Sequence, residues 1–144
     1  MLRKMIIASA ALLLSAQVPA ADVSAGLRYA ARSSFDRIWS QTSLFRNGIE
    51  LCYFDTGRLD GCNDGGSGNG WDMEYGAGEI TKEGPGSYIR SVSVVHGVVI
   101  ITTRNIEFNG EDSFTEIQVP ELNEEKKLDW TVWPGSSCAK AGIC

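Results

Sequence analysis

A helical periodicity constrains the fold of this chain more than any other feature of its sequence. Apolar and small residues recur at steps of four and three between Leu27 and Cys52. This spacing follows one face of an α-helix for about seven turns. The positions that share this face are Leu27, Ala31, Phe35, Ile38, Thr42, Phe45, Ile49 and Cys52. Charged residues such as Arg46 and Glu50 fall off this line and are expected in solvent. The apolar stripe itself must be buried against another element.

The helix has a predicted end and a predicted bend. Asp55-Thr56-Gly57 is a plausible stop, because Gly57 adopts the left-handed conformation of a C-terminal cap without steric cost. Gly48 costs about 1 kcal/mol inside a helix and is expected to mark a bend.

After Gly86 the period of the apolar residues changes to two. Four segments rich in β-branched residues are predicted as strands: 88–95, 98–104, 113–119 and 128–133. His96-Gly97 and Asn109-Gly110 are typical of tight turns with positive φ, and a further turn is expected at Asn123-Glu124. Such hairpin links favour an antiparallel sheet that buries the helix stripe. The predicted class is α+β, with a long N-terminal helix packed on a roughly four-stranded antiparallel sheet.

Residues 1–20 are typical of a secretory signal peptide. Arg3 and Lys4 precede an apolar run from Met5 to Val18, and small residues lead to a predicted cleavage after Ala20. As a helix the apolar run rises only about 21 Å, less than the roughly 30 Å of a bilayer core. We therefore expect export through Sec, no transmembrane segment in the mature chain, and one globular domain at residues 21–144. The expected location is the periplasm, the cell surface or the medium.

The four cysteines of an exported chain favour two disulfides. Three connectivities are possible, and short loops containing glycine favour Cys52–Cys62 together with Cys138–Cys144. Closing each loop is worth about 2–3 kcal/mol. A zinc site of four thiolates is the alternative, but its ligands usually come in pairs such as C-x2-C.

Between Asp60 and Gly86 the chain is rich in glycine and other turn formers, with only a short apolar stretch around Trp71 to Ile80. A phosphate-binding loop is not favoured, because no buried strand precedes the glycines and no helix is expected after them. Four acidic residues suggest calcium instead: Asp60, Asp64, Asp72 and Glu74. Their spacing does not follow an EF-hand loop. An irregular calcium loop remains open, and a solvated acidic loop is favoured.

The composition argues against most catalytic chemistry. His96 is the only histidine, which excludes a site with several histidine ligands, and its predicted place is an exposed hairpin tip. The formal net charge is −5, and without Arg3 and Lys4 the chain has 11 basic and 18 acidic residues. This balance opposes binding to nucleic acid. We expect no catalytic residue, no cofactor and no metal.

The order of these features resembles the soluble domain of a type IV pilin of the type IVa class. The segment YAARSSFDRIWSQTSLFRNGIELCYFDTGRLDGCNDGGSGNG (29–70) is similar to the lower helix of the family, its exit loop and its early cysteine pair. YIRSVSVVHGVVIITT (88–103) resembles the family's hairpin, and KKLDWTVWPGSSC (126–138) with Cys144 resembles its last strand and C-terminal disulfide loop. The resemblance implies protein partners, namely pilins or other pilus components. It also points to residues 60–86 and 138–144 as contact regions.

The N-terminus departs from the family's pattern. Pilins carry a short basic leader that ends in glycine before a methylated phenylalanine, and a glutamate follows within the apolar half-helix. This chain has no Gly-Phe junction, and its first acidic residue is Asp22, beyond the apolar run. We therefore expect an exported, non-catalytic pilin-like protein that is a monomer in isolation and acts in or around a pilus, as filament component, accessory subunit or adhesion module. The alternative is a small secreted effector or hydrolase that uses acidic residues between Asp60 and Glu83.

Overall fold

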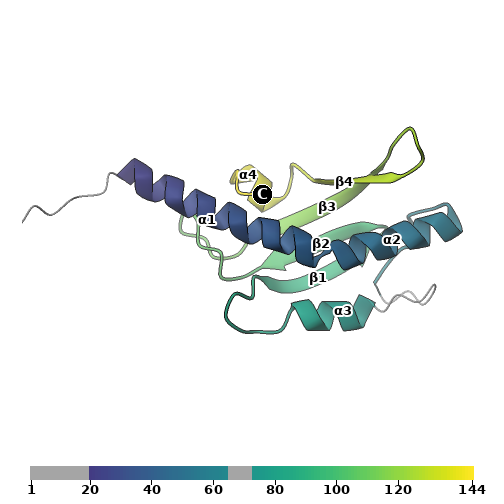
Figure 1. Ribbon diagram of the computed structural model, residues 1–144, viewed down its shortest axis with the longest axis horizontal. Helices are drawn as coiled ribbons and strands as arrows, with labels where there is room; N and C mark the ends of the chain where they lie inside the picture. The colour runs from purple at the N-terminus through teal and green to yellow at the C-terminus, as the bar shows by residue number, and fades with distance from the viewer. Residues whose placement is uncertain (1–19, 65–72) are drawn as a thin grey trace, which may run out of the picture.

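The structure is a computed structural model that describes residues 20–64 and 73–144, and its class is α+β as predicted (Figure 1). Helices α1 and α2 come first, α3 follows, and α4 lies near the C-terminus after four strands. The helices are α1 (Ala20–Gln41), α2 (Ser43–Thr56), α3 (Met73–Ile80) and α4 (Ser137–Lys140). The strands are β1 (Ile89–Val95), β2 (Val98–Thr103), β3 (Thr115–Leu122) and β4 (Leu128–Val132). Residues 1–19 of the expected signal peptide lie outside the described residues.

The four strands form one antiparallel sheet in the order β1-β2-β3-β4, which confirms the predicted meander. The tight turn between β1 and β2 has φ values of 50° at His96 and 76° at Gly97. Asn109 and Gly110 take the same left-handed conformation in the connection from β2 to β3. Asparagine, histidine and glycine tolerate this region better than β-branched residues, so the turn sequences fix the hairpins locally.

The predicted single helix is wrong in one respect, because it is divided at Thr42 rather than bent at Gly48. The Thr42 hydroxyl donates a 2.8 Å hydrogen bond to the carbonyl of Ile38, and Arg46 donates to the carbonyl of Trp39 at 2.8 Å. A threonine that bonds back to the preceding turn bends a helix. Here two side chains satisfy the carbonyls at the end of α1. The predicted stop is confirmed, since Gly57 caps α2 with φ 69°.

The helix stripe forms the core against the sheet, as expected. Ala31, Phe35, Ile38, Phe45 and Ile49 are almost completely buried. They pack with strand residues of which Ile89, Val94, Val99 and Ile101 are fully buried. Two residues of the helical segment differ from the prediction: Leu27, at the start of the stripe, is 45% exposed, and Arg46, expected in solvent, is buried.

Helix α3 was not predicted from the sequence, and its presence corrects the expectation that no helix follows the glycine-rich segment. It lies beside β1 at the edge of the sheet (Figure 1). Ala77 and Ile80 pack against the core from this side. Its eight residues contain two glycines, which weaken the helical signal of such a short segment. Among the described residues no helix is both long and apolar enough to cross a membrane.

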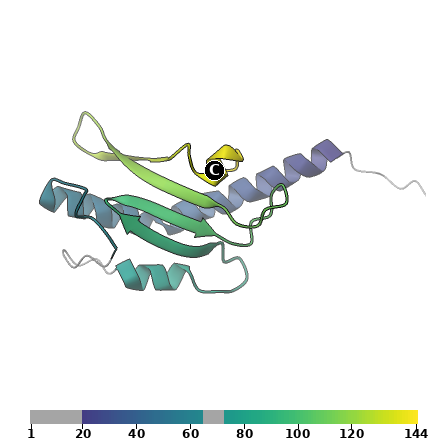
Figure 2. The same cartoon turned by 180° about the vertical axis from the view of Figure 1, so that it is seen from behind.

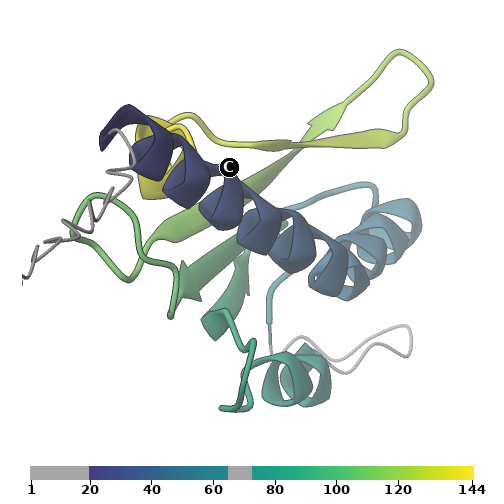
Figure 3. The same cartoon turned by 60° about the vertical axis from the view of Figure 1, so that its left-hand side comes forward.

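Helices α1 and α2 cross one face of the sheet (Figure 1). Figure 2 shows the molecule from behind, where β1, β2 and β3 face the viewer with α1 and α2 beyond them. In Figure 3 the C-terminal loop with α4 lies beside the first turns of α1. The described part of the sheet therefore has a helix-covered inner face and an outer face that no described helix covers.

Candidate functional site

All four cysteines form disulfides, and the pairs are Cys52–Cys62 and Cys138–Cys144, the two favoured from loop length. The first ties the last turns of α2 to the segment after Gly57. That segment is also held to the β1–β2 hairpin, because the Cys62 carbonyl accepts a 2.8 Å hydrogen bond from the amide of Gly97. The second closes the C-terminal loop. The two bonds fit an oxidising extracytoplasmic compartment.

His96 lies at the tip of the β1–β2 hairpin and is exposed, as predicted. Its ring nitrogen Nδ1 lies 2.8 Å from the carbonyl oxygen of Asp60, and its amide donates to Asn63 Oδ1 at 2.7 Å. Both contacts hold residues 60–63, at the end of the loop closed by Cys52–Cys62, against the hairpin. The position of the ring therefore has a structural explanation that involves no reacting group.

In the acidic segment between Asp60 and Glu83, the described carboxylates have local partners. Asp60 pairs with Arg58, and Glu83 pairs with Arg104. Asp64 Oδ2 accepts a hydrogen bond from the amide of Val94, and Glu79 pairs with a lysine one turn along the chain. Asp72 and the side chain of Glu74, named above as calcium candidates, lie outside the described part. Each of these described acids therefore pairs with a neighbouring cation or accepts a hydrogen bond from the backbone.

The most unusual site in the molecule is a buried polar cluster of Thr42, Arg46, Glu116 and Gln118, where α1 meets α2 above β3. Gln118 is fully buried and lies at its centre. Its Oε1 accepts from Arg46 at 2.7 Å, and its Nε2 donates to Thr42 Oγ1 at 2.9 Å and to Glu116 Oε1 at 2.6 Å. Arg46 also stacks over the Trp39 ring, 4.1 Å from its centroid. The cluster thus satisfies the polar atoms that the helix junction brings into the core.

Burial dominates the electrostatics of this polar cluster. Glu116 is only 1% exposed, and desolvation raises its pKa to about 7. The hydrogen bond from Gln118 and the charge of Arg46 act in the opposite direction on the pKa of this carboxyl. Desolvation likewise lowers the pKa of Arg46, against the charges of Glu116 and Glu50. Arg46 stays charged at any ordinary pH, so Glu116 is the group of the pair that titrates near neutrality.

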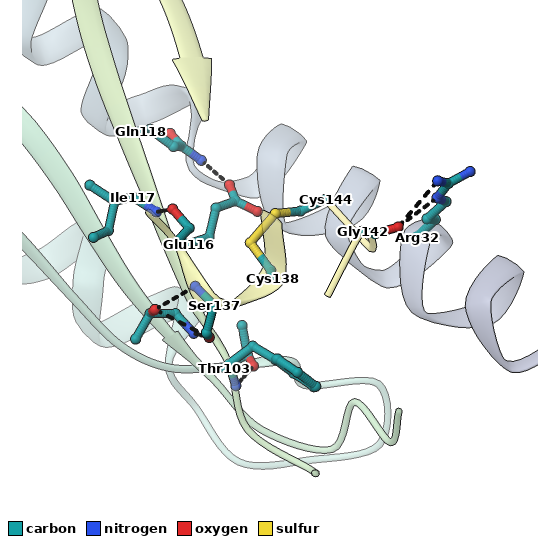
Figure 4. Close-up of a disulfide and its surroundings, with 12 residues drawn as sticks. Arg32, Thr103, Glu116, Ile117, Gln118, Ser137, Cys138, Gly142 and Cys144 are labelled. Carbon is teal, nitrogen blue, oxygen red and sulfur yellow. Dashed lines mark hydrogen bonds between the residues drawn. A yellow bond between two sulfur atoms is a disulfide. The ribbon is translucent and has the colours of Figure 1, made fainter. Parts of the chain in front are cut away.

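The polar cluster adjoins the C-terminal disulfide (Figure 4). A carboxylate oxygen of Glu116 and the sulfur atoms of Cys138 and Cys144 all lie within 4.8 Å of one another. In the described part of the chain this is the one group of three potential metal-ligand side chains. Metal binding by cysteine requires thiolates, and both sulfurs are bonded to each other. The group is therefore no metal site while the disulfide is intact.

Two arginines of α1 hold the C-terminal loop. Arg28 Nη1 donates to the carbonyls of Ala141 and Gly142, each at 3.1 Å. Arg32 donates twice to the Gly142 carbonyl, from Nε at 3.2 Å and from Nη2 at 3.1 Å (Figure 4). On the other side, the hydroxyls of Ser136 and Ser137 accept from amides of β3. The loop predicted as a contact region is thus fixed to both layers of the fold.

The outer face of the sheet is apolar. Ile100 is paired with Ile117 across β2 and β3, next to the inward pair Val99 and Gln118, so both isoleucines point away from the helices. The same alternation places four further apolar residues on this side, and the outer sheet face is defined by Val95, Val98, Ile100, Ile117, Val119 and Trp133. None of them belongs to the core cluster, and all are half-buried or exposed. A Cβ at position 135 would collide with the Trp133 ring, so the glycine there lets the indole approach the backbone closely.

Sequence reasoning missed the polar cluster. It treated SFTEIQV as an ordinary strand, whereas Phe114, Glu116 and Gln118 point inward and Ile117 and Val119 point outward. The signal was present, because the alternation that buries Phe114 also buries Glu116 and Gln118.

Comparison of the chain with protein-family models, curated proteins and solved structures finds no match.

Proposed function

We propose that this protein is a non-catalytic, exported interaction module that acts in or around a type IV pilus. The observation that carries the proposal is the outer sheet face. Six apolar side chains gather there on the side of the sheet that no described helix covers. Uncovered apolar patches on small domains mark contact sites for other proteins.

The chemistry of this face favours a protein contact over catalysis. Its residues are uncharged, and Thr102, Thr115 and Thr131 lie on the same side of the strands. The register places Glu121 and Asp129 on the same side, next to the β3–β4 turn. The apolar part of the face, with hydroxyl groups beside it, offers packing and a few hydrogen bonds.

The resemblance to type IV pilins supplies the proposed partner. The element order supports it: a divided N-terminal helix, an exit loop closed by Cys52–Cys62, an antiparallel meander, and a loop closed by Cys138–Cys144. Either of two roles explains why an acidic domain has an exposed apolar face. The protein is an accessory subunit that docks on a pilus, or it is an adhesion module that the pilus carries.

Co-sedimentation tests the proposal. Protein of residues 21–144 is mixed with type IV pili purified from a bacterium that encodes it, and the pellet is examined by gel and by electron microscopy. We expect the protein to pellet only with pili and to decorate them. A protein that stays in the supernatant at every pilus concentration would overturn the proposed role.

Matched variants locate the contact. Val95→Lys places a charge on the outer sheet face, at a side chain that is 42% exposed. Val23→Lys makes the same change on α1, at a side chain that is 50% exposed. We expect Val95→Lys to abolish co-sedimentation and Val23→Lys to leave it unchanged. Equal binding by both variants would remove the outer sheet face from the proposal.

A further inference from the structure

A second surface, separate from the outer sheet face, lies between α2 and the turn that joins β3 to β4. It is a groove of about 720 Å³, lined on the helix side by Glu50, Tyr53 and Phe54 and on the hairpin side by Leu128 and Asp129. Residues 125–127 of the turn (Glu-Lys-Lys) also line it. Figure 1 shows the end of α2 and this turn at the same end of the molecule. The groove is hereafter the α2 groove.

The helix wall of this groove continues into an apolar stripe on the solvent side of α2. Leu44, Leu51 and Phe54 are exposed and recur at steps of seven and three, so they lie on one side of the helix. Phe54 is 86% exposed, the largest fraction among the large apolar side chains of the described chain. This spacing is that of the contact positions of paired helices. A second helix therefore fits against α2 along this stripe.

The charges of the α2 groove select the partner. Among the described residues Glu50 and Asp129 form no ion pair; they accept hydrogen bonds from the Trp130 indole and from Asn123. Of the two lysines in the lining, Lys127 is paired with Glu125 at 2.9 Å. With Lys126 included, the lining carries three acidic and two basic residues, a formal charge of −1. On the other flank of the stripe Asp55 is exposed. Two aromatic rings next to unpaired carboxylates favour a cationic side chain, which gains both ionic and cation–π attraction.

From this juxtaposition we propose that the α2 groove binds a cationic amphipathic helix of a partner protein. Apolar residues of that helix pack on Leu51 and Phe54, and its arginine or lysine side chains reach Glu50 and Asp129. This is the helix-in-groove mode of recognition, in which spaced apolar anchors give affinity and flanking charges set orientation.

Peptide binding to the isolated protein tests the inference. The probe is a fluorescent synthetic helix of leucine, alanine and arginine, and its twin has glutamate in place of every arginine. Fluorescence anisotropy gives affinity, and the NMR signal of the Trp130 indole N–H reports whether the groove is occupied, since this group bonds to Glu50. We expect the arginine peptide to bind with an affinity that falls as salt rises, and to shift the Trp130 signal. Equal binding of the two peptides, or no binding, would overturn the inference.

Exposed aromatic residues give a matched pair of variants. Phe54→Ser removes the anchor at the groove, and Tyr29→Ser removes a side chain on α1 that is 77% exposed. Neither change touches the core, so both variants are expected to fold. We expect Phe54→Ser to weaken the arginine peptide at least about tenfold and Tyr29→Ser to have no effect. Glu50→Gln combined with Asp129→Asn is expected to remove the salt dependence.

The outcome is independent of the pilus experiment, because the assay contains no pili. Val95→Lys, which alters the outer sheet face, is expected to bind the arginine peptide as the unaltered protein does. Equal loss of binding in Phe54→Ser and Tyr29→Ser, or loss in Val95→Lys, would refute the placement of the site in the α2 groove.

Discussion

At the scale of single residues, burial of the Glu116 carboxyl costs free energy, because folding removes this group from water. Glu116 has lost nearly all contact with water, and its partners are the amide of Gln118 and, through it, the guanidinium of Arg46. Because the charged form suffers most from desolvation, the folded state favours the protonated carboxyl. Protonation of this residue is therefore linked to folding.

The first prediction is that protein stability falls as pH rises through the titration of Glu116. Folding raises the pKa of this carboxyl from 4.5 to about 7, so the folded protein binds the proton more tightly than the unfolded chain does. The stabilisation that this proton gives is fully present below pH 4.5, the pKa of Glu116 in the unfolded chain. It is lost as pH rises through about 7, the pKa of Glu116 in the folded protein. Its size is about 3 kcal/mol.

Urea denaturation at a series of pH values measures this loss. Glu116→Gln removes the titration and keeps an acceptor for Gln118. The quantity to compare is the free energy of unfolding of the variant minus that of the unaltered protein. We expect this difference to rise by about 3 kcal/mol between pH 4.5 and values above 7, because only the unaltered protein loses stability over that range. Parallel profiles for the two proteins would contradict the assignment.

The second prediction concerns His96. His96→Asn is expected to keep the fold and to change the free energy of unfolding by no more than about 0.5 kcal/mol, because asparagine tolerates positive φ and the site is exposed. The variant loses only the contact of the ring with the Asp60 carbonyl. Urea denaturation checks the value. A cost of several kcal/mol would mean that the ring has a role beyond this contact.

At the scale of elements, α1 acts as the support of the C-terminal loop. Arg28 and Arg32 stand one turn apart and meet adjacent carbonyls of that loop, while serine hydroxyls fasten its other side to β3. The disulfide restricts the loop internally, and the arginines fix where the closed loop lies.

The third prediction follows from this support. Arg32→Ala removes the two hydrogen bonds from Arg32 to the Gly142 carbonyl and leaves the one from Arg28, and amide hydrogen exchange in residues 139–144 is expected to accelerate. Because Arg32 is exposed, the global free energy of unfolding should change by less than about 1 kcal/mol.

Arg37→Ala is the matched control, since Arg37 lies on the same helix but contacts the ring of Tyr88 instead of the C-terminal loop. Exchange in residues 139–144 should be unaffected in this variant. Acceleration of equal size in both variants would show that the loop responds to the charge of α1 and not to the hydrogen bonds of Arg32.

At the scale of the whole molecule, the outer sheet face is too small to hold two copies together. Its residues span three to four strands and about two rows, an area on the order of 300 Å². A stable complex buries about 800 Å² on each partner, so a stable dimer needs contacts beyond this face, as does the proposed docking on a pilus. The net negative charge adds repulsion between copies.

The fourth prediction is therefore that protein of residues 21–144 sediments as a monomer and forms no filaments alone. Analytical ultracentrifugation over a wide concentration range and electron microscopy check it. Filaments assembled from this protein would contradict the prediction, because another surface would then have to supply their core.

Much of the fold follows from the sequence alone, because its determinants are local. The helix stripe, the change of period after Gly86, and turn residues such as His96-Gly97 predict the helical segment, the strands and the hairpins. The short spacings within Cys52–Cys62 and Cys138–Cys144 favour the observed pairs for the same reason, since nearby cysteines meet whatever the rest of the chain does.

Only the tertiary structure decided the features that depend on distant partners. The break at Thr42, the burial of Arg46 and the inward direction of Glu116 and Gln118 require one another, because each polar group is tolerated in the core only when the others satisfy it. Two of these bonds join residues that are more than 70 positions apart in the chain. The alternation of β3 indicates that Glu116 and Gln118 point inward with Phe114, but no periodicity of one segment shows which residues satisfy them, since the cost of burying a polar side chain depends on what lies across from it in the fold.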